Sequence, residues 1–135
     1  MIEMKLEVVV VPVSDIERAK KFYEEQLGFV LEVDMPIGEH YRTVQLTPLG
    51  SGCSINLDNG YTKMEPGTVK GLQLVVANVD NVRQVLLNNG VNVSSVQHYE
   101  GTQFVEGRGG RWNSFIFFSD PDGNEWVVQE RPAEE

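Results

Sequence analysis

The chain has 135 residues, of which 41% are hydrophobic and 23% charged, a composition typical of one globular domain with a buried core. No apolar run approaches the about 20 residues that a membrane-spanning helix needs, and the net charge of -9 argues against nucleic acid or an anionic membrane as a partner. The single cysteine, Cys53, excludes an internal disulfide, and the first residues lack the features of a secretory signal, so we expect a cytoplasmic protein.

The first half of the chain predicts a strand, a helix and three further strands. The apolar run VVVVPV at residues 8–13 indicates a buried strand. Residues 14–28 predict an amphipathic helix, because Ser14 and Glu17 have the spacing of a capping box and Gly28 stands where helices commonly end. Alternating stretches then indicate strands at residues 29–35, 41–47 and 52–58.

The same order of elements returns after a polar linker. The linker, residues 61–70, contains glycine and proline and lacks hydrophobic periodicity. A second strand–helix pair follows, with the strand at residues 71–76 and an amphipathic helix at residues 78–90. Three more strands are predicted at residues 91–97, 113–119 and 124–130.

The two halves are related as an internal repeat. A shift of 63 residues carries Asp15 onto Asn78 at the start of each helix, and a shift of 73 carries Gly50 onto Gly123 in the turn before each last strand. We therefore predict an α+β fold made of duplicated βαβββ modules, whose two four-stranded sheets form a curled mixed sheet with a cleft. The single domain then contains module 1, the linker and module 2 at residues 1–60, 61–70 and 71–135.

Strand alternation predicts which side chains face the cleft. In module 1 the apolar residues should pack on the helix, and these are Val44, Leu46, Cys53, Ile55 and Leu57. The repeat then predicts the inward residues of module 2, which are Ser114, Ile116, Phe118, Val127 and Gln129. The side chains that we predict to bind a ligand in the cleft are Tyr41, Gln45, Ser54, Asn56, Gln73, Phe118 and Gln129. The alternative is that the polar members lie on a solvated sheet edge or hydrogen-bond one another.

Four motifs accompany this order of elements: VVPVSD, QLTPLGSGCSI, GLQLVV and FSDPDGNEWVVQE. Together with the repeated module they resemble the vicinal oxygen chelate superfamily, which includes glyoxalase I, extradiol dioxygenases, and bleomycin- and fosfomycin-resistance proteins. They are most similar to an uncharacterised bacterial subgroup of glyoxalase-like proteins. The resemblance covers nearly the whole chain, and it implies the glyoxalase/bleomycin-resistance fold and a homodimer.

The metal-dependent members of this superfamily take their ligands from four strand positions. By resemblance, these positions correspond here to Val8, Ser54, Gly71 and Val127. Divalent transition metals need imidazole, carboxylate or thiolate donors, which none of these side chains supplies. We therefore expect neither a metal ion nor another cofactor.

Two other features offer chemistry. His98 is a candidate general base, because histidine titrates near neutral pH, although a histidine at a strand end is often simply exposed. The glycine-rich segment GTQFVEGRGGRW, residues 101–112, could form a lid in which Arg108 closes over an anionic or carbonyl-bearing ligand and Trp112 stacks on a planar one. The alternative for this segment is a flexible surface hairpin.

Our leading interpretation is a metal-free protein that binds a small molecule, as the resemblance to the bleomycin-resistance branch implies. The alternative is an enzyme, a lyase or isomerase acting on a small carbonyl compound through His98 or a carboxylate in the cleft. A metal enzyme with displaced ligands ranks last.

Overall fold

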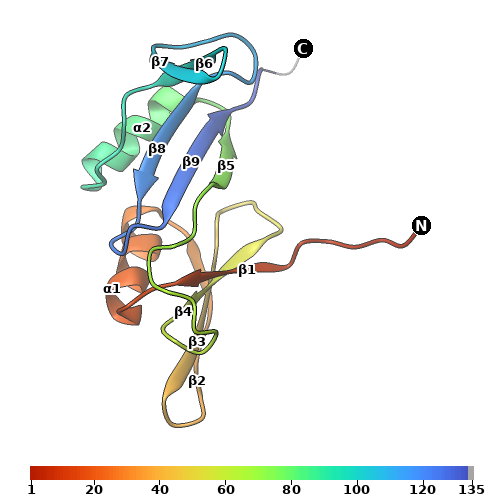
Figure 1. Cartoon of the computed structure of the whole chain (residues 1–135), viewed down its shortest axis with the longest axis vertical. Coiled ribbons are helices and arrows are strands. Elements are labelled where there is room, and N and C mark those ends of the chain that lie inside the picture. Colours follow the sequence, from red (N-terminus) through yellow and green to blue (C-terminus); the bar gives the residue numbers. More distant parts are fainter. Residues whose placement is uncertain (134–135) are drawn as a thin grey trace. The chain divides into compact units, whose positions relative to one another are not determined.

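In the computed structural model, which describes residues 1–133, the helices and strands form two units (Figure 1). Unit 1 contains residues 1–69 together with the turn at residues 121–124. Unit 2 contains residues 70–120 and the chain from residue 125 onward. None of the helices in the described part of the chain has the length and apolar character needed to cross a membrane.

Unit 1 contains the predicted strand, helix and three strands. Its strands form one sheet in the order β1-β4-β3-β2, with β1 parallel to β4 and the other neighbours antiparallel. The elements are β1 (Val8–Pro12), α1 (Ile16–Lys21), the π-helix η1 (Phe22–Gln26), β2 (Val30–Ile37), β3 (Tyr41–Thr47) and β4 (Ser54–Asp58).

The first helix begins one residue later than predicted. Asp15, not Ser14, is its N-cap, because the Asp15 carboxylate accepts a hydrogen bond of 3.1 Å from the backbone N–H of Arg18. Ser14 instead donates its hydroxyl to Oδ1 of Asp122, at 2.6 Å. The helical segment ends as predicted before Gly28, whose φ of 77° is the left-handed conformation that glycine adopts readily.

The predicted core of unit 1 is confirmed except at Cys53, which is only half-buried. Val44, Leu46, Ile55 and Leu57 are all buried on one face of the sheet. The helical segment packs there through Ala19 and its other buried residues. The intervening residues of β3 and β4 therefore lie on the face turned away from the helix, which we call the open face.

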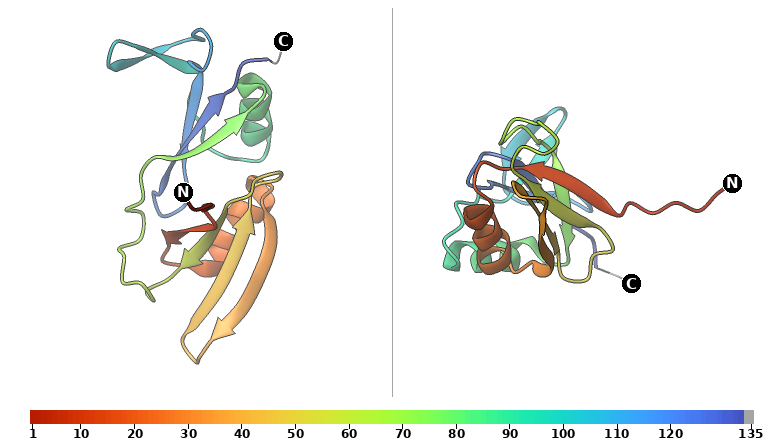
Figure 2. Two further views of the ribbon diagram at one scale, coloured as in Figure 1. Left: turned by 90° about the vertical axis from the view of Figure 1, so that its right-hand side faces the viewer. Right: turned by 90° about the horizontal axis from the view of Figure 1, so that it is seen from below.

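Unit 2 has five strands, not the predicted four, in the order β5-β9-β8-β6-β7. The predicted strand at residues 91–97 is wrong. Ser94 bonds the backbone of Phe117 in β8 with its own N–H and its hydroxyl, and these two bonds stand where the predicted strand would have paired. The β6–β7 hairpin, which turns at Gly101, forms the end of the sheet instead of the predicted strand (Figure 2). The elements are β5 (Leu72–Val76), α2 (Val79–Asn88), β6 (Gln97–Glu100), β7 (Gln103–Glu106), β8 (Phe115–Ser119) and β9 (Glu125–Glu130).

The register of β8 on β9 reverses the predicted facing of β8. In unit 1 Gln45 pairs with Asn56, whereas in unit 2 Phe115 pairs with Gln129, so the second connection is three residues longer. Because side chains alternate with a period of two, an odd change in length moves every β8 side chain to the opposite face. The prediction that Phe118 faces the cleft, together with Ser114 and Ile116, is therefore wrong.

These three side chains lie on the α2 side of the sheet. Their exposed fractions are only 1% for Ser114, 0% for Ile116 and 5% for Phe118. The Phe118 ring is parallel to that of Trp126, its cross-strand partner, with 6.1 Å between the ring centroids. The open face of β8 is formed instead by Phe115 and Phe117.

The turn at residues 121–124 is held within unit 1 by a fully buried asparagine. The side chain of Asn124 donates to the carbonyl of Pro12 at 2.8 Å and accepts from the N–H of Val69 at 3.1 Å. Gly67 lies so close that an added Cβ would stand 2.1 Å from the carbonyl oxygen of Asp122. The sequence PDGN therefore does more than close a hairpin, since its last residue satisfies the backbone of two other segments.

Replacing Asn124 with alanine should lower the free energy of unfolding by about 2 kcal/mol, because the Val69 N–H loses its partner, the Pro12 carbonyl loses one donor while keeping the Gly67 N–H, and the side chain leaves a space. Urea denaturation followed by circular dichroism measures this loss. Asn59→Ala, at an exposed asparagine in the same unit, is the matched control and should change stability by less than about 0.5 kcal/mol. Equal effects of the two substitutions would contradict the role assigned to Asn124.

Candidate functional site

A hollow of about 380 Å³ lies on the open face of the unit 2 sheet. Polar and apolar side chains converge on it from all five strands, as is usual for small-molecule sites. The residues that line it are Gly71, Gln73, Tyr99, Phe104, Phe115, Phe117, Glu125, Trp126, Val127 and Gln129.

Four aromatic rings form one side of this hollow, and we call Tyr99, Phe104, Phe115 and Phe117 the aromatic wall. The β6–β7 register places Tyr99 opposite Phe104, with their ring centroids 3.8 Å apart. Phe104 also meets Phe117 edge to face at 4.7 Å. Phe115 is buried behind the outer pair, whereas Tyr99 and Phe104 keep exposed fractions of 46% and 36%. The outer rings therefore offer an apolar surface to a ligand.

Two glutamines lie across the sheet from the aromatic wall. Nε2 of Gln73 donates to Oε1 of Gln129 at 2.8 Å, and Nε2 of Gln129 donates to the backbone carbonyl of Trp112, also at 2.8 Å. The structure thus brings together two of the predicted ligand-binding residues, and it joins them by the mutual hydrogen bond that the sequence left open. We call Gln73, Gln129 and the Trp112 carbonyl the amide relay.

The predicted site residues of unit 1 lie on the open face of its own sheet. Gln45 is paired with Asn56, whose side-chain oxygen accepts from the Thr43 hydroxyl at 3.1 Å. Tyr41 meets Tyr61 edge to face, with ring centroids 5.3 Å apart.

Ser54 differs from these residues because its side chain is almost fully buried. Its exposed fraction is 7%, and its hydroxyl lies 2.6 Å from that of Thr47. The hydroxyl is therefore already engaged inside unit 1.

The glycine-rich segment is not an open lid in this structure. Gln103–Glu106 forms strand β7, and the guanidinium of Arg108 is bound by Glu130 and by Asp80, the latter at 2.5 Å. Trp112 adopts a φ of 61°, which is unusual for a bulky residue, and its side chain is 49% exposed. Arg108 is thus occupied as a structural clamp between α2 and β9.

His98 lies on the face of β6 opposite to Tyr99, and so away from the aromatic wall. Its Nδ1 is 2.8 Å from the carbonyl oxygen of Gly107, and its Nε2 is 2.8 Å from a carboxylate oxygen of Glu100. Both partners only accept hydrogen bonds, so both bonds form together only when the ring is protonated. The Gly107 carbonyl and then the Glu100 carboxylate accordingly raise the pKa of His98.

The four positions that correspond to metal ligands do not fit a divalent ion. In unit 1 Val8 pairs with Ser54, and in unit 2 Gln73 pairs with Val127. Because Ser54 and Val127 are equivalent in the repeat, Gln73 is the structural equivalent of Val8. The predicted equivalent, Gly71, lies two residues earlier. Valine has no donor atom, the Ser54 hydroxyl is engaged with Thr47, and the Gln73 amide is engaged with Gln129. Within residues 1–133, no three His, Cys, Asp or Glu side chains are grouped so that they could hold a metal ion.

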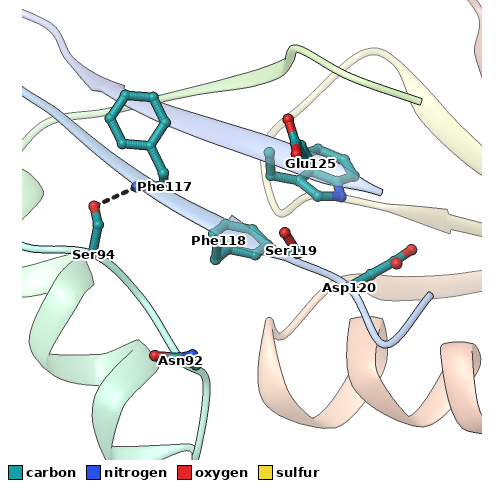
Figure 3. A pocket seen from close by; sticks show the side chains of 8 residues that line it. Asn92, Ser94, Phe117, Phe118, Ser119, Asp120 and Glu125 are labelled. Carbon is teal, nitrogen blue, oxygen red and sulfur yellow. Dashed lines mark hydrogen bonds between the residues drawn. The ribbon is translucent and has the colours of Figure 1, made fainter. Parts of the chain in front are cut away.

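A second hollow, of about 670 Å³, lies beside β8, where Phe117, Phe118 and Ser119 line it (Figure 3). Ser94, whose hydroxyl accepts from the backbone N–H of Phe117, stands at one side of it, and Asp120 stands at the other. Phe118 lines this hollow and not the one on the open face. We place the candidate site at the smaller hollow, because only there do an aromatic surface and the amide relay converge.

The sequence did not single out Tyr99, Phe115 or Phe117. In the run FIFF every residue is apolar, so hydrophobicity could not tell which alternate pair is buried under the helix. Tyr99 follows a predicted strand that does not exist, and its place opposite Phe104 depends on the β6–β7 hairpin. The connection between the paired strands is three residues longer in unit 2 than in unit 1. This difference in length is the feature that could have revealed which side of β8 is buried.

One family model and two solved structures match more than nine tenths of this chain. The family model of the Glyoxalase/Bleomycin resistance protein/Dioxygenase superfamily matches residues 5–128. The crystal structure of TnmS3, an antibiotic binding protein from Streptomyces sp. CB03234, is 34% identical, with 97% of this chain and 98% of that chain covered and a TM-score of 0.80. A glyoxalase/bleomycin resistance protein from the same organism is 35% identical over 93% of this chain and 99% of that chain, with a TM-score of 0.75.

A curated relative is more distant. The uncharacterized protein YetH of Bacillus subtilis (strain 168) is 25% identical over 123 residues, which are 90% of this chain and 94% of YetH.

Replacing Glu100 with glutamine should lower the pKa of His98, because the neutral amide removes the charged partner. Since the folded-state pKa is raised, the Glu100 contact stabilises the fold fully below the unfolded pKa of about 6.5, and this stabilisation is lost as pH rises through the folded pKa. NMR titration of the His98 ring and denaturation at pH 5.5 and 9 measure the two effects. The stability gap between wild type and Glu100→Gln should be present at the lower pH and absent at the higher.

The matched control is Glu39→Gln, at an exposed carboxylate in unit 1, which should leave the titration of His98 unchanged. An unchanged His98 titration in Glu100→Gln would contradict the assigned contact.

Proposed function

The chain belongs to the Glyoxalase/Bleomycin resistance protein/Dioxygenase superfamily, and from this premise we propose that it binds a small organic molecule without a metal ion. The observation that carries the proposal is the hollow on the open face of unit 2, where the aromatic wall and the amide relay converge. Exposed aromatic rings supply contact area, and amides orient a polar group of the ligand without acid–base chemistry.

The relationship to TnmS3, an antibiotic binding protein, supports a small-molecule ligand. The polar residues on the open face of unit 1 are proposed to bind a ligand on that face of their own sheet. These residues are Tyr41, Gln45 and Asn56. The side chain of Ser54 is proposed to support the unit 1 sheet through Thr47, and that of Arg108 to support the unit 2 sheet through Asp80 and Glu130.

We further propose a homodimer in the cytoplasm, as the resemblance to the superfamily implies. His98 does not support an enzymatic alternative, because the ring lies on the opposite side of β6 from the hollow and both of its nitrogens are engaged. Binding without turnover is therefore the function that we put forward.

Phe104→Ala should weaken the binding of aromatic small molecules about tenfold, because it removes the ring that joins Tyr99 to Phe117. A thermal-shift screen of small molecules finds the ligands, and calorimetry on wild type and variant measures the change. Val105→Ala is the control, since the neighbouring side chain points to the other face of β7 and should leave affinity unchanged. Equal losses in both variants would contradict a site on the open face, and chemical conversion of the bound molecules would contradict a pure binder.

The absence of metal ligands at the family positions predicts the response to divalent ions. Titration with nickel, zinc or manganese ions by calorimetry should give no tight stoichiometric binding, because valine and engaged side chains replace the donors. Binding of small molecules should also survive dialysis against a chelator. One tightly bound ion per chain would refute the metal-free proposal.

A further inference from the structure

We propose that the site selects ligands that carry a hydroxyl group on an aromatic ring, and that the carbonyl oxygen of Gln73 makes this selection. The inference rests on the proposed function, because it names the class of molecule that the same hollow takes. It follows from the direction of the hydrogen bonds in the amide relay.

The direction of the relay is fixed at one end by the backbone. The carbonyl of Trp112 can only accept, so the side-chain atom of Gln129 that lies 2.8 Å away must be the nitrogen. The Gln129 oxygen then points at Gln73 and must receive a hydrogen from the Gln73 nitrogen, again at 2.8 Å. A flip of either amide would set two nitrogens or two oxygens against each other.

The Trp112 carbonyl is held in place by its own loop. Asn113, the next residue, binds Tyr99 through both of its side-chain polar atoms, accepting from the backbone N–H at 2.8 Å and donating to the backbone carbonyl at 3.1 Å. Its backbone N–H also bonds the carbonyl of Gly110 at 3.2 Å. The loop is thus anchored on β6, the strand that carries part of the aromatic wall, so the relay and the wall have a fixed relation within unit 2.

The other end of the relay is the side-chain oxygen of Gln73, a residue that lines the hollow. Gln73 is exposed, lines the hollow, and makes one side-chain hydrogen bond within residues 1–133, the one that its nitrogen donates to Gln129. Its carbonyl oxygen is therefore available to a ligand as an acceptor. Each amide nitrogen also keeps a second hydrogen, so a group that both donates and accepts meets this end of the relay best.

The charge of the hollow excludes a second class of ligand. Glu125, which forms an exposed ion pair of 3.3 Å with Lys70, is the charged residue among those that line it, and the chain as a whole carries a net charge of -9. A carboxylate or phosphate on the ligand would meet the Gln73 oxygen and a glutamate without a cation among the lining residues. An ether oxygen in the same place would face an acceptor without a hydrogen between them. An aromatic hydroxyl avoids both conflicts and leaves its ring for the aromatic wall.

The test compares three probes of one ring size: 2-naphthol, 2-methoxynaphthalene and 2-naphthoate. Calorimetry or ligand-observed NMR on the full chain should show 2-naphthol binding about five- to tenfold more tightly than the methyl ether, which corresponds to one hydrogen bond, and 2-naphthoate binding most weakly. Gln73→Met keeps the shape of the side chain but removes the acceptor, so the preference for the hydroxyl should fall to about onefold. Gln103→Met, at an exposed glutamine of β7, is the matched control and should keep the preference.

The outcomes separate this inference from the proposed function. Equal binding of 2-naphthol and the methyl ether, or the same preference in Gln73→Met as in wild type, would overturn the selection by Gln73 and leave a binding site on the aromatic wall standing. Preferred binding of 2-naphthoate would overturn the charge argument and with it the inference. Failure of all three probes to bind at millimolar concentration would overturn the site itself, together with everything built on it.

Discussion

The register of β8 on β9 is the constraint on which the candidate site depends. Because Phe115 pairs with Gln129, and Phe117 with Val127, two aromatic rings share the open face with an amide and an aliphatic side chain. A register shifted by one residue would put Ile116 and Phe118 there and bury the two rings under α2. The same pairing orders the helix side of the sheet, where Trp126 lies beside Phe118.

The segment between β7 and β8 supports the binding surface through contacts with α2 and β9. Its clamp, Arg108, joins α2 to β9 through Asp80 and Glu130, and its last residues fix the carbonyl of Trp112. One glycine of this segment permits a close contact between backbone groups. An added Cβ at Gly109 would stand 2.3 Å from the carbonyl oxygen of Asn113.

The scaffold has kept the geometry of its family while its strand positions hold other chemistry. Val8 faces Ser54, and Gln73 faces Val127, at equivalent places in the two ladders. In unit 1 these positions hold Val8 and the Ser54 hydroxyl, which is hydrogen-bonded to Thr47. In unit 2 they hold Val127 and Gln73, which begins the amide relay. The two halves of the repeat have therefore diverged in the surface that they offer to a ligand.

The sequence by itself determined the order of elements in unit 1, the repeat, the superfamily and most of the helix-facing residues of module 1, because capping residues, turn glycines and two-residue periodicity are local signals. The inward facing of Gln129 and Val127 followed from alternation within one strand. Only the tertiary structure decided the facing of β8, the β6–β7 hairpin and the partners of Arg108 and Gln73. These depend on strand pairing and loop length, and an all-apolar run such as FIFF contains no polar residue to reveal which of its sides is buried.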